Sequence, residues 1–123
     1  MSNDGFFAVA TPEQPWEERY NEKLGKSLFR KELYIDPETG AEIRIVRYPA
    51  GLVNPAHTHP CGHGLYVLEG ELVTHKGTFV WFPEGEVMEH GAGPEADVTV
   101  LFITNKRFRI DYVEPPAPGS IPA

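Results

Sequence analysis

The sequence predicts a small all-β domain, because short apolar runs follow one another closely and turn-forming residues separate them. Twelve glycines and twelve prolines occur among the 123 residues, and they fall between those runs. We find no segment with the spacing of a helix of normal length, no heptad pattern and no internal repeat. Strands this short and this closely spaced are typical of a β-sandwich or a β-barrel.

The clearest element is a hairpin. Residues 27–35 and 41–48 flank Asp36-Pro37-Glu38-Thr39-Gly40, a turn in which the proline presets φ and the glycine accepts a positive φ. In the second strand, Ile43 and Ile45 alternate with charged residues, as side chains on the two faces of a strand do. Further strands are expected at residues 64–68, 71–75, 79–82, 98–104 and 108–113.

The length of the chain suits one domain with one hydrophobic core. Residues 1–25 are predicted to form a polar N-terminal arm, in which residues 17–21 could make a helical turn. Residues 26–113 are predicted to form the β-domain. Residues 114–123 are predicted to be a proline-rich tail, because proline cannot donate to a sheet ladder.

Charge and composition exclude several classes of partner. A net charge of −7 and a pI near 5.1 would repel a phosphate backbone, so nucleic acid is not an expected partner. Cys61 is the single cysteine, which excludes an internal disulfide and fits a reducing compartment. The N-terminus lacks the basic and then apolar order of a signal peptide, and no stretch approaches the roughly 20 apolar residues of a membrane span. We expect a soluble, cytoplasmic protein that does not bind membranes.

Three of the five histidines lie within seven residues, at His57, His59 and His63. In an extended segment alternate side chains share a face, so His57 and His59 point the same way, about 7 Å apart at their Cα atoms. Two imidazoles placed in this way can converge on one ion at the bond length of about 2.0–2.1 Å that a transition metal requires. Pro60-Cys61-Gly62 has the composition of a turn that brings His63 back to the same centre. Polar residues at a barrel rim are the alternative, but the clustering favours a metal site.

The histidine spacing resembles the first motif of the cupin superfamily. Gly51 is followed after five residues by His57-Thr58-His59, after three more by His63, and after six more by Gly70. The family has glutamate where this chain has His63. A second cupin motif is similar to Gly77, five residues, Pro83-Glu84-Gly85, but Met88 stands at its histidine position. This resemblance covers residues 26–113 and implies a cupin double-stranded β-helix, or jelly-roll, barrel.

The two departures from the cupin motifs shape the expected metal site. Replacing the family's glutamate with His63 removes a negative charge and favours iron or zinc, with nickel, manganese and copper as alternatives, over magnesium or calcium. His90 is two residues after Met88, so in a strand it faces the same side but lies about 7 Å further along. We therefore expect a β-bulge near residues 86–89 to bring the His90 ring to the metal site. The predicted ligands are therefore His57, His59, His63 and His90, with a thioether ligand at Met88 as the alternative to an ordinary apolar lining residue.

Other candidate residues have weaker support. Cys61 could be a ligand or redox thiol, although a small residue filling the loop is the simpler interpretation, and His75 is expected to be solvated. Glu89 could orient an imidazole. Four aromatic residues could line an apolar pocket or simply pack in the core: Tyr66, Phe79, Trp81 and Phe102.

The resemblance implies three candidate functions. Some cupins that cleave carbon–carbon bonds with oxygen use three histidines and no carboxylate, so a dioxygenase acting on a small enolisable or chelating oxygen compound is the first. The segments around residues 33–40 and 57–71 also look like the cupin half of anti-sigma factors of the ChrR type, which implies a zinc-binding sensor as the second. An isomerase or lyase acting on a sugar-like acid is the third. Cupins often pair through edge strands, so we expect a homodimer, with the N-terminal arm able to cross to the second subunit.

Overall fold

A computed structural model describes residues 5–73 and 77–113 of the chain. A 3₁₀ turn, η1 (Thr11–Glu13), precedes nine strands. The strands are β1 (Glu17–Asn21), β2 (Lys26–Ile35), β3 (Glu42–Tyr48), β4 (Val53–Thr58), β5 (His63–Glu69), β6 (Phe79–Phe82), β7 (Met88–Gly91), β8 (Val98–Thr104) and β9 (Asp111–Tyr112). Within the described residues there is no helix long and apolar enough to cross a membrane.

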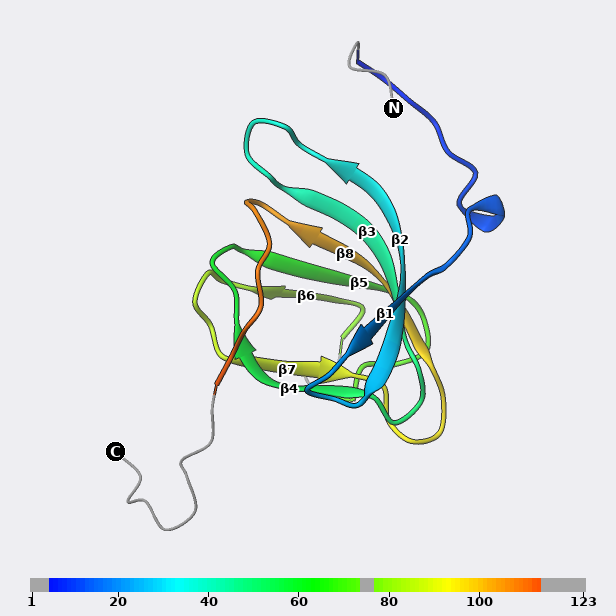
Figure 1. The fold of residues 1–123 in the computed structure, drawn as a ribbon, viewed down its shortest axis with the longest axis vertical. Coiled ribbons are helices and arrows are strands. Elements are labelled where there is room, and N and C mark those ends of the chain that lie inside the picture. The colour runs from blue at the N-terminus through cyan, green and yellow to red at the C-terminus, as the bar shows by residue number, and fades with distance from the viewer. Residues whose placement is uncertain (1–4, 74–76, 114–123) are drawn as a thin grey trace.

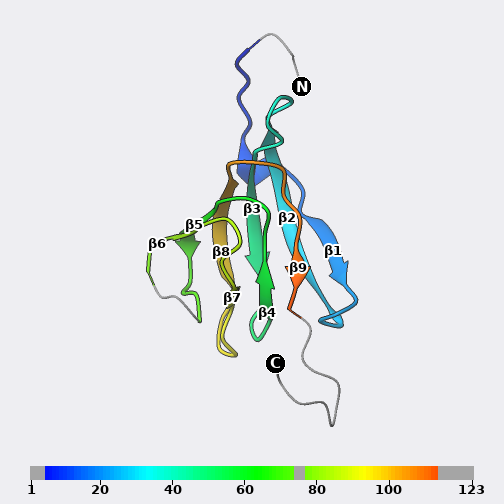
Figure 2. The same cartoon turned by 90° about the vertical axis from the view of Figure 1, so that its left-hand side faces the viewer.

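The strands form two antiparallel sheets. The larger sheet has the order β1-β2-β3-β8-β5-β6, and the smaller sheet has the order β7-β4-β9. Figure 1 shows the larger sheet curving so that β5 and β6 lie on one side of the barrel and β4 and β7 on the other, and Figure 2 shows the same arrangement turned by 90°. Neighbours in the larger sheet are distant in sequence, such as β3 beside β8 and β8 beside β5. The predicted all-β jelly-roll barrel is confirmed.

The core lies between the two sheets and follows the alternation of strand side chains. On β8, Val98, Val100 and Phe102 are buried, and on the neighbouring strand β3, Val46 and Tyr48 are buried beside them on the same face of the sheet. Burying a side chain of this kind contributes about 1.5–3 kcal/mol. The histidine cluster described below lies within this core, since all of its members are buried as well.

The predicted hairpin is present as β2 and β3. Its turn is held by the Asp36 carboxylate, whose Oδ1 accepts a hydrogen bond from the backbone N–H of Glu38 at 2.8 Å, and by Gly40 at φ +77°. The strands expected at residues 79–82 and 98–104 have these bounds in the structure, and the one expected at 64–68 is one residue longer at each end. In these segments the alternation of apolar residues and the turn residues were therefore sufficient to predict the strands and their approximate bounds.

Three of the other expectations need correction. Residues 17–21 are not a helical turn but the strand β1, which pairs with β2 and carries an ion pair between Glu17 and Arg30 at 3.5 Å. The strand expected at 108–113 shortens to β9. In the strand expected at 71–75, Leu72 makes an isolated bridge to Ala92, while residues 74–76, including His75, lie outside the described residues, as does the predicted tail at 114–123.

Candidate metal centre

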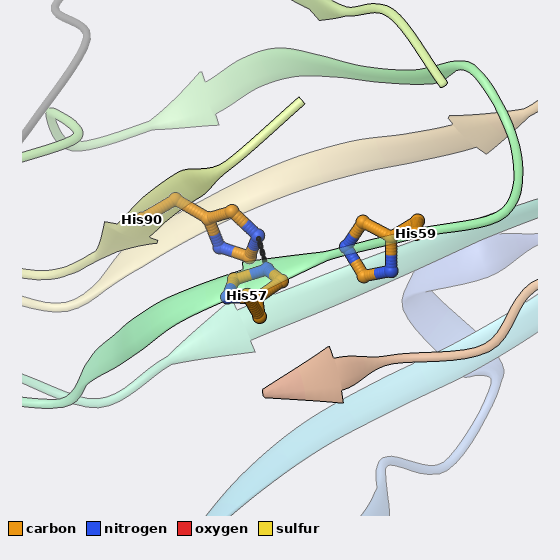
Figure 3. Close-up of side chains that lie close together, drawn as sticks. All are labelled: His57, His59 and His90. Atoms are coloured by element: carbon orange, nitrogen blue, oxygen red, sulfur yellow. Dashed lines mark hydrogen bonds between the residues drawn. The ribbon is translucent and has the colours of Figure 1, made fainter. Parts of the chain in front are cut away.

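Four histidines meet inside the barrel, and each is at most 2% exposed. His57 lies on β4, His59 directly after β4, His63 at the start of β5 and His90 on β7. Their ring centroids form a closed circuit: 4.8 Å from His57 to His59, 5.0 Å from His59 to His63, 5.5 Å from His63 to His90 and 4.8 Å from His90 to His57. Figure 3 shows His57 and His90 meeting, with a ring nitrogen of His59 turned toward them.

The local chain conformation explains why the first three histidines come together. His57 and His59 are two residues apart in extended backbone, and both are buried. The chain then turns at residues 60–62, where the backbone N–H of Gly62 donates to Oδ1 of Asn105 at 2.8 Å. A Cβ atom at Gly62 would lie 2.5 Å from the ring of Trp81, so a larger residue here would force the Trp81 side chain to shift. His63 follows at the head of β5.

His90 reaches the cluster because β4, rather than β7, is irregular. Asn54 pairs with His90 and His57 pairs with Met88, so three steps along β4 match two along β7. A β-bulge was expected near residues 86–89, and this position was wrong. The extra residue lies on β4, between Asn54 and His57. It brings the Nε2 atoms of His57 and His90 to 3.1 Å. Met88 is 1% exposed and belongs to the buried apolar cluster.

Backbone carbonyls orient three of the four imidazoles. His57 Nδ1 donates to the carbonyl of Pro55 at 2.6 Å, and His59 Nδ1 donates to the carbonyl of Arg109 at 2.7 Å. His63 Nδ1 lies 3.4 Å from the carbonyl of Ile103. A carbonyl can only accept, so the proton of each neutral ring is on Nδ1 and the Nε2 lone pair is exposed to the centre of the cluster. Metal-binding histidines in proteins are usually held in this way.

The Nε2 atoms fit a bound cation. Those of His59 and His63 are buried and have no hydrogen-bond partner among the described residues, a state that costs about 1–3 kcal/mol for each atom. Two imidazoles on one ion at about 2.0–2.1 Å would have their nitrogens about 2.8–3.4 Å apart for angles between 90° and 109°, and the His57–His90 distance of 3.1 Å lies in this range. Ligand nitrogens of His57, His59 and His90 all lie within 4.8 Å of one another, so these three buried histidines could hold a metal ion. His63 is outside this group, although its ring centroid lies 5.0 Å from that of His59.

Burial also keeps the imidazoles in the form that binds metal. Loss of hydration lowers the pKa of His57, lowers the pKa of His59 to about 4 and lowers the pKa of His63 to about 3. For His63, the neighbouring His59 adds to the effect of burial. At neutral pH these rings are therefore uncharged, and a metal does not have to displace protons from them.

The remaining candidates do not enter the cluster. Cys61 is fully buried, its burial raises the pKa of the thiol, and it is not in the group of converging ligand atoms found among the described residues. Glu89 is exposed, and its charge makes a minor contribution that raises the pKa of His57. Three of the four aromatic residues are neither pocket lining nor core, because Tyr66, Phe79 and Trp81 are each about half exposed (46%, 54% and 46%).

A cavity of about 180 Å³ lies beside the cluster and is lined in part by His59 and His90. Phe102, predicted as a pocket or core residue, is also in its wall. The other lining residues were not singled out from the sequence: Arg19, Tyr20, Asn21, Leu28, Arg30, Arg44, Val46, Tyr48, Asn54, Phe108 and Ile110. Several are polar residues on strands, and a polar residue on the inner face of a barrel strand is the signal that could have identified them.

The fold is shared with solved structures of low sequence identity. A candidate acetylacetone dioxygenase from Methylibium petroleiphilum aligns over 100% of this chain and 90% of its own, at 18% identity and a TM-score of 0.73. The polyketide cyclase RemF from Streptomyces resistomycificus aligns over 92% and 89%, at 18% identity and a TM-score of 0.69. A chain in the complex of Rhodobacter sphaeroides SigE with the anti-sigma ChrR aligns over 75% and 50%, at 22% identity and a TM-score of 0.58.

Comparisons of the sequence with known proteins and families assign the chain to a family. A comparison with curated protein sequences gave no match. The family model described as the ChrR Cupin-like domain matches residues 5–108, which is most of the chain and includes all four clustered histidines. The chain therefore belongs to the ChrR Cupin-like domain family.

Proposed function

We propose that His57, His59, His63 and His90 bind one divalent transition metal ion, with iron or zinc preferred, and that the centre promotes attack of O₂ on a small enolisable or chelating oxygen compound. The observation that carries this proposal is the cavity, because two of the four proposed ligands, His59 and His90, also line it. An ion held there would have one side open to a small molecule, which is what a catalytic centre needs and a purely structural one does not.

The residues of the chain have defined roles in this proposal. The Nε2 atoms hold the ion, and the carbonyls of Pro55 and Arg109 fix the rings of His57 and His59 through their Nδ1 protons. No carboxylate is among the ligands, so the centre keeps its full positive charge and favours an enolate over a neutral ketone. When bound, the metal would supply Lewis acidity and, if it is iron, redox chemistry with O₂. The histidines themselves are at most 2% exposed, which limits the contact of bulk water with the ligand nitrogens.

The comparison with other cupins supports the fold on which this proposal rests. The candidate acetylacetone dioxygenase shares the fold over the whole of this chain. At 18% identity that likeness concerns the fold, so the substrate class depends on the chemistry of an all-imidazole site beside a small cavity.

Metal analysis and oxygen uptake test the proposal together. Protein purified without added metal should contain close to one equivalent of a transition metal, and iron-loaded protein should consume O₂ with at least one member of a panel of small β-diketones. The double variant His57→Ala/His59→Ala should lose both properties, whereas Met88→Leu, a change in the neighbouring apolar lining, should keep the metal. Equal metal content in the parent and the double variant would contradict the proposal.

A zinc-binding sensor is the second candidate, favoured by the match to the ChrR Cupin-like domain. Four imidazoles can complete a tetrahedral zinc site with no open position. The solved complex of SigE with ChrR shows that an anti-sigma protein shares this fold. Zinc at full occupancy, with no oxygen uptake after iron loading, would favour the sensor over the enzyme.

A further inference from the structure

The cavity beside the histidines has a charge opposite to that of the protein. The chain carries a net charge of −7. Among the fourteen residues that line the cavity there are three arginines, Arg19, Arg30 and Arg44, and no aspartate or glutamate. A wall of this composition attracts small anions, and its effect is strengthened by the low dielectric of the surrounding core.

Arg44 is the most deeply placed of the three. It lies on the inner face of β3, and its side chain is 7% exposed, against 22% for Arg30 and 54% for Arg19. Its guanidinium lies over the rings of Phe102 and Phe108, at 4.2 Å and 4.6 Å from their centroids. These contacts hold the cation in place through the ring faces and leave its in-plane donors for other partners.

The same two rings connect Arg44 to the proposed metal ligands. The ring of Phe102 lies 4.3 Å from that of His63, and the ring of Phe108 lies 4.8 Å from that of His59, centroid to centroid. Arg44 is therefore separated from two of the histidines by a single aromatic ring. A ligand in the cavity could present one oxygen to the histidine cluster and another to the guanidinium.

The hydrogen-bonding capacity of Arg44 is largely unused. Its Nη1 is 3.7 Å from the Glu42 carboxylate, which is long for a charge-assisted hydrogen bond, and its Nε is buried with no hydrogen-bond partner among the described residues. The Nε of Arg30 is buried without a partner as well, but Arg19 and Arg30 both pair with the carboxylate of Glu17 and are more exposed than Arg44. A buried guanidinium with unsatisfied donors is unfavourable until an acceptor arrives. The carboxyls near Arg44, those of Glu42 and Glu32, do not line the cavity.

We propose that Arg44 recognises a small organic anion, a carboxylate that carries a second oxygen on the adjacent carbon, and so selects the ligand of the histidine centre. The second oxygen points to the cluster at His59 and His90, and the carboxylate points to Arg44. This inference rests on the proposed function for the role of the second oxygen, but the recognition of the anion depends on Arg44 alone. The small volume of the cavity, about 180 Å³, restricts the ligand to a compact molecule.

Calorimetry with two matched probes tests the proposal. The anion is 2-oxobutanoate, and the neutral probe is 1-hydroxy-2-butanone, which has a hydroxymethyl group in place of the carboxylate. Binding is measured to zinc-loaded and to chelator-treated protein, with the metal content of each sample determined. The variants are Arg44→Met, which removes the charge, and Arg44→Lys, which keeps it. Arg47→Met is the matched control, because Arg47 is on the same strand, contacts Trp16 and Phe29, and does not line the cavity.

We expect the zinc-loaded parent to bind 2-oxobutanoate at least about tenfold more tightly than the neutral probe, the effect of one or two charge-assisted hydrogen bonds. Arg44→Met should abolish this preference, Arg44→Lys should retain part of it, and Arg47→Met should change it less than about twofold. Equal binding of the two probes by the parent, failure of the parent to bind the anion, or a full preference in Arg44→Met would overturn the proposal. If Arg44→Met does not fold, the parent and Arg44→Lys still decide the question.

The two proposals fail in different ways. If the protein takes up no metal, the proposed function is wrong, yet the chelator-treated parent should still prefer the anion in an Arg44-dependent manner. If the protein binds metal and both probes bind equally, the metal site stands and the role of Arg44 is refuted.

Discussion

The Nε2 atoms of His57 and His90 lie 3.1 Å apart, although 33 residues separate them in the sequence. Since Nδ1 of His57 donates to a carbonyl, its Nε2 carries a lone pair that points at the His90 ring. The extra residue in β4 is what sets this approach. Two ring nitrogens held at this distance inside a core suit either one shared proton or one shared cation, and the unsatisfied Nε2 atoms of His59 and His63 beside them favour the cation.

Removing His90 should weaken metal binding. His90→Ala takes away one imidazole from the proposed set, and we expect the dissociation constant for zinc to rise by more than about 100-fold, above the range seen for the loss of a residue that only orients a ligand. Competition with a chromogenic chelator measures this. Met88→Leu serves as the control, because Met88 pairs opposite His57 on the same strand as His90 but packs in the apolar core. A larger loss in Met88→Leu than in His90→Ala would identify the thioether as the ligand instead.

The metal-free protein should lose stability as the pH falls from 7.5 to 5. The pKa of His59 is lowered to about 4 in the folded state, whereas in the unfolded chain it returns to about 6.5, so below pH 6.5 the unfolded state binds more protons. The stabilisation is therefore complete above pH 6.5 and is lost progressively toward pH 4, by about 3 kcal/mol for a shift of this size. Urea unfolding in the presence of a chelator measures it, and His59→Gln should reduce the dependence without removing it, because the pKa values of His57 and His63 are lowered as well. An unchanged free energy of unfolding between pH 7.5 and 5 would contradict this account.

The parts of the fold and of the site that depend on local spacing could be predicted from the sequence. The parity of His57 and His59 follows from extended backbone, and the turn before His63 follows from its proline and glycine. The hairpin at β2 and β3 was equally clear. In each case the relevant interactions lie within a few residues of one another.

The remainder depends on contacts between distant segments. β1 is polar and without apolar alternation, so only its pairing with β2 makes it a strand. The bulge that positions His90 lies in β4, whose register is set by β7 rather than by its own residues. In β3 the alternation of isoleucine with Arg44 indicates a strand but not its inner face, and Arg44 is buried because Phe102 and Phe108 provide aromatic surfaces for its guanidinium.

The homodimer stays a prediction, and its test follows from the sheet edges. Among the described strands β6 is at one edge of the larger sheet, and its Phe79 and Trp81 are about half exposed. The described part of the arm contacts its own subunit, since Lys31 Nζ donates to the carbonyl of Thr11 at 2.7 Å. If pairing occurs through β6, Phe79→Glu should shift the protein toward monomer in sedimentation velocity, whereas Val113→Glu, an exposed change beyond β9, should not. A monomeric parent would refute the prediction.

The two glycines that end the first motif and begin the second should respond very differently to a methyl group. Gly70 has φ +84°, and a Cβ atom there would lie 2.4 Å from the carbonyl oxygen of Asp97. Backbone cannot move away as a flexible side chain can, so Gly70→Ala should destabilise the protein by about 2–4 kcal/mol through strain and overpacking. At Gly77 the nearest atom would be 3.7 Å away, so Gly77→Ala should change the free energy of unfolding by less than about 1 kcal/mol. Chemical denaturation of both variants checks the contrast, and similar losses in the two would mean that the close approach of β5 to residues 97–98 is absent in solution.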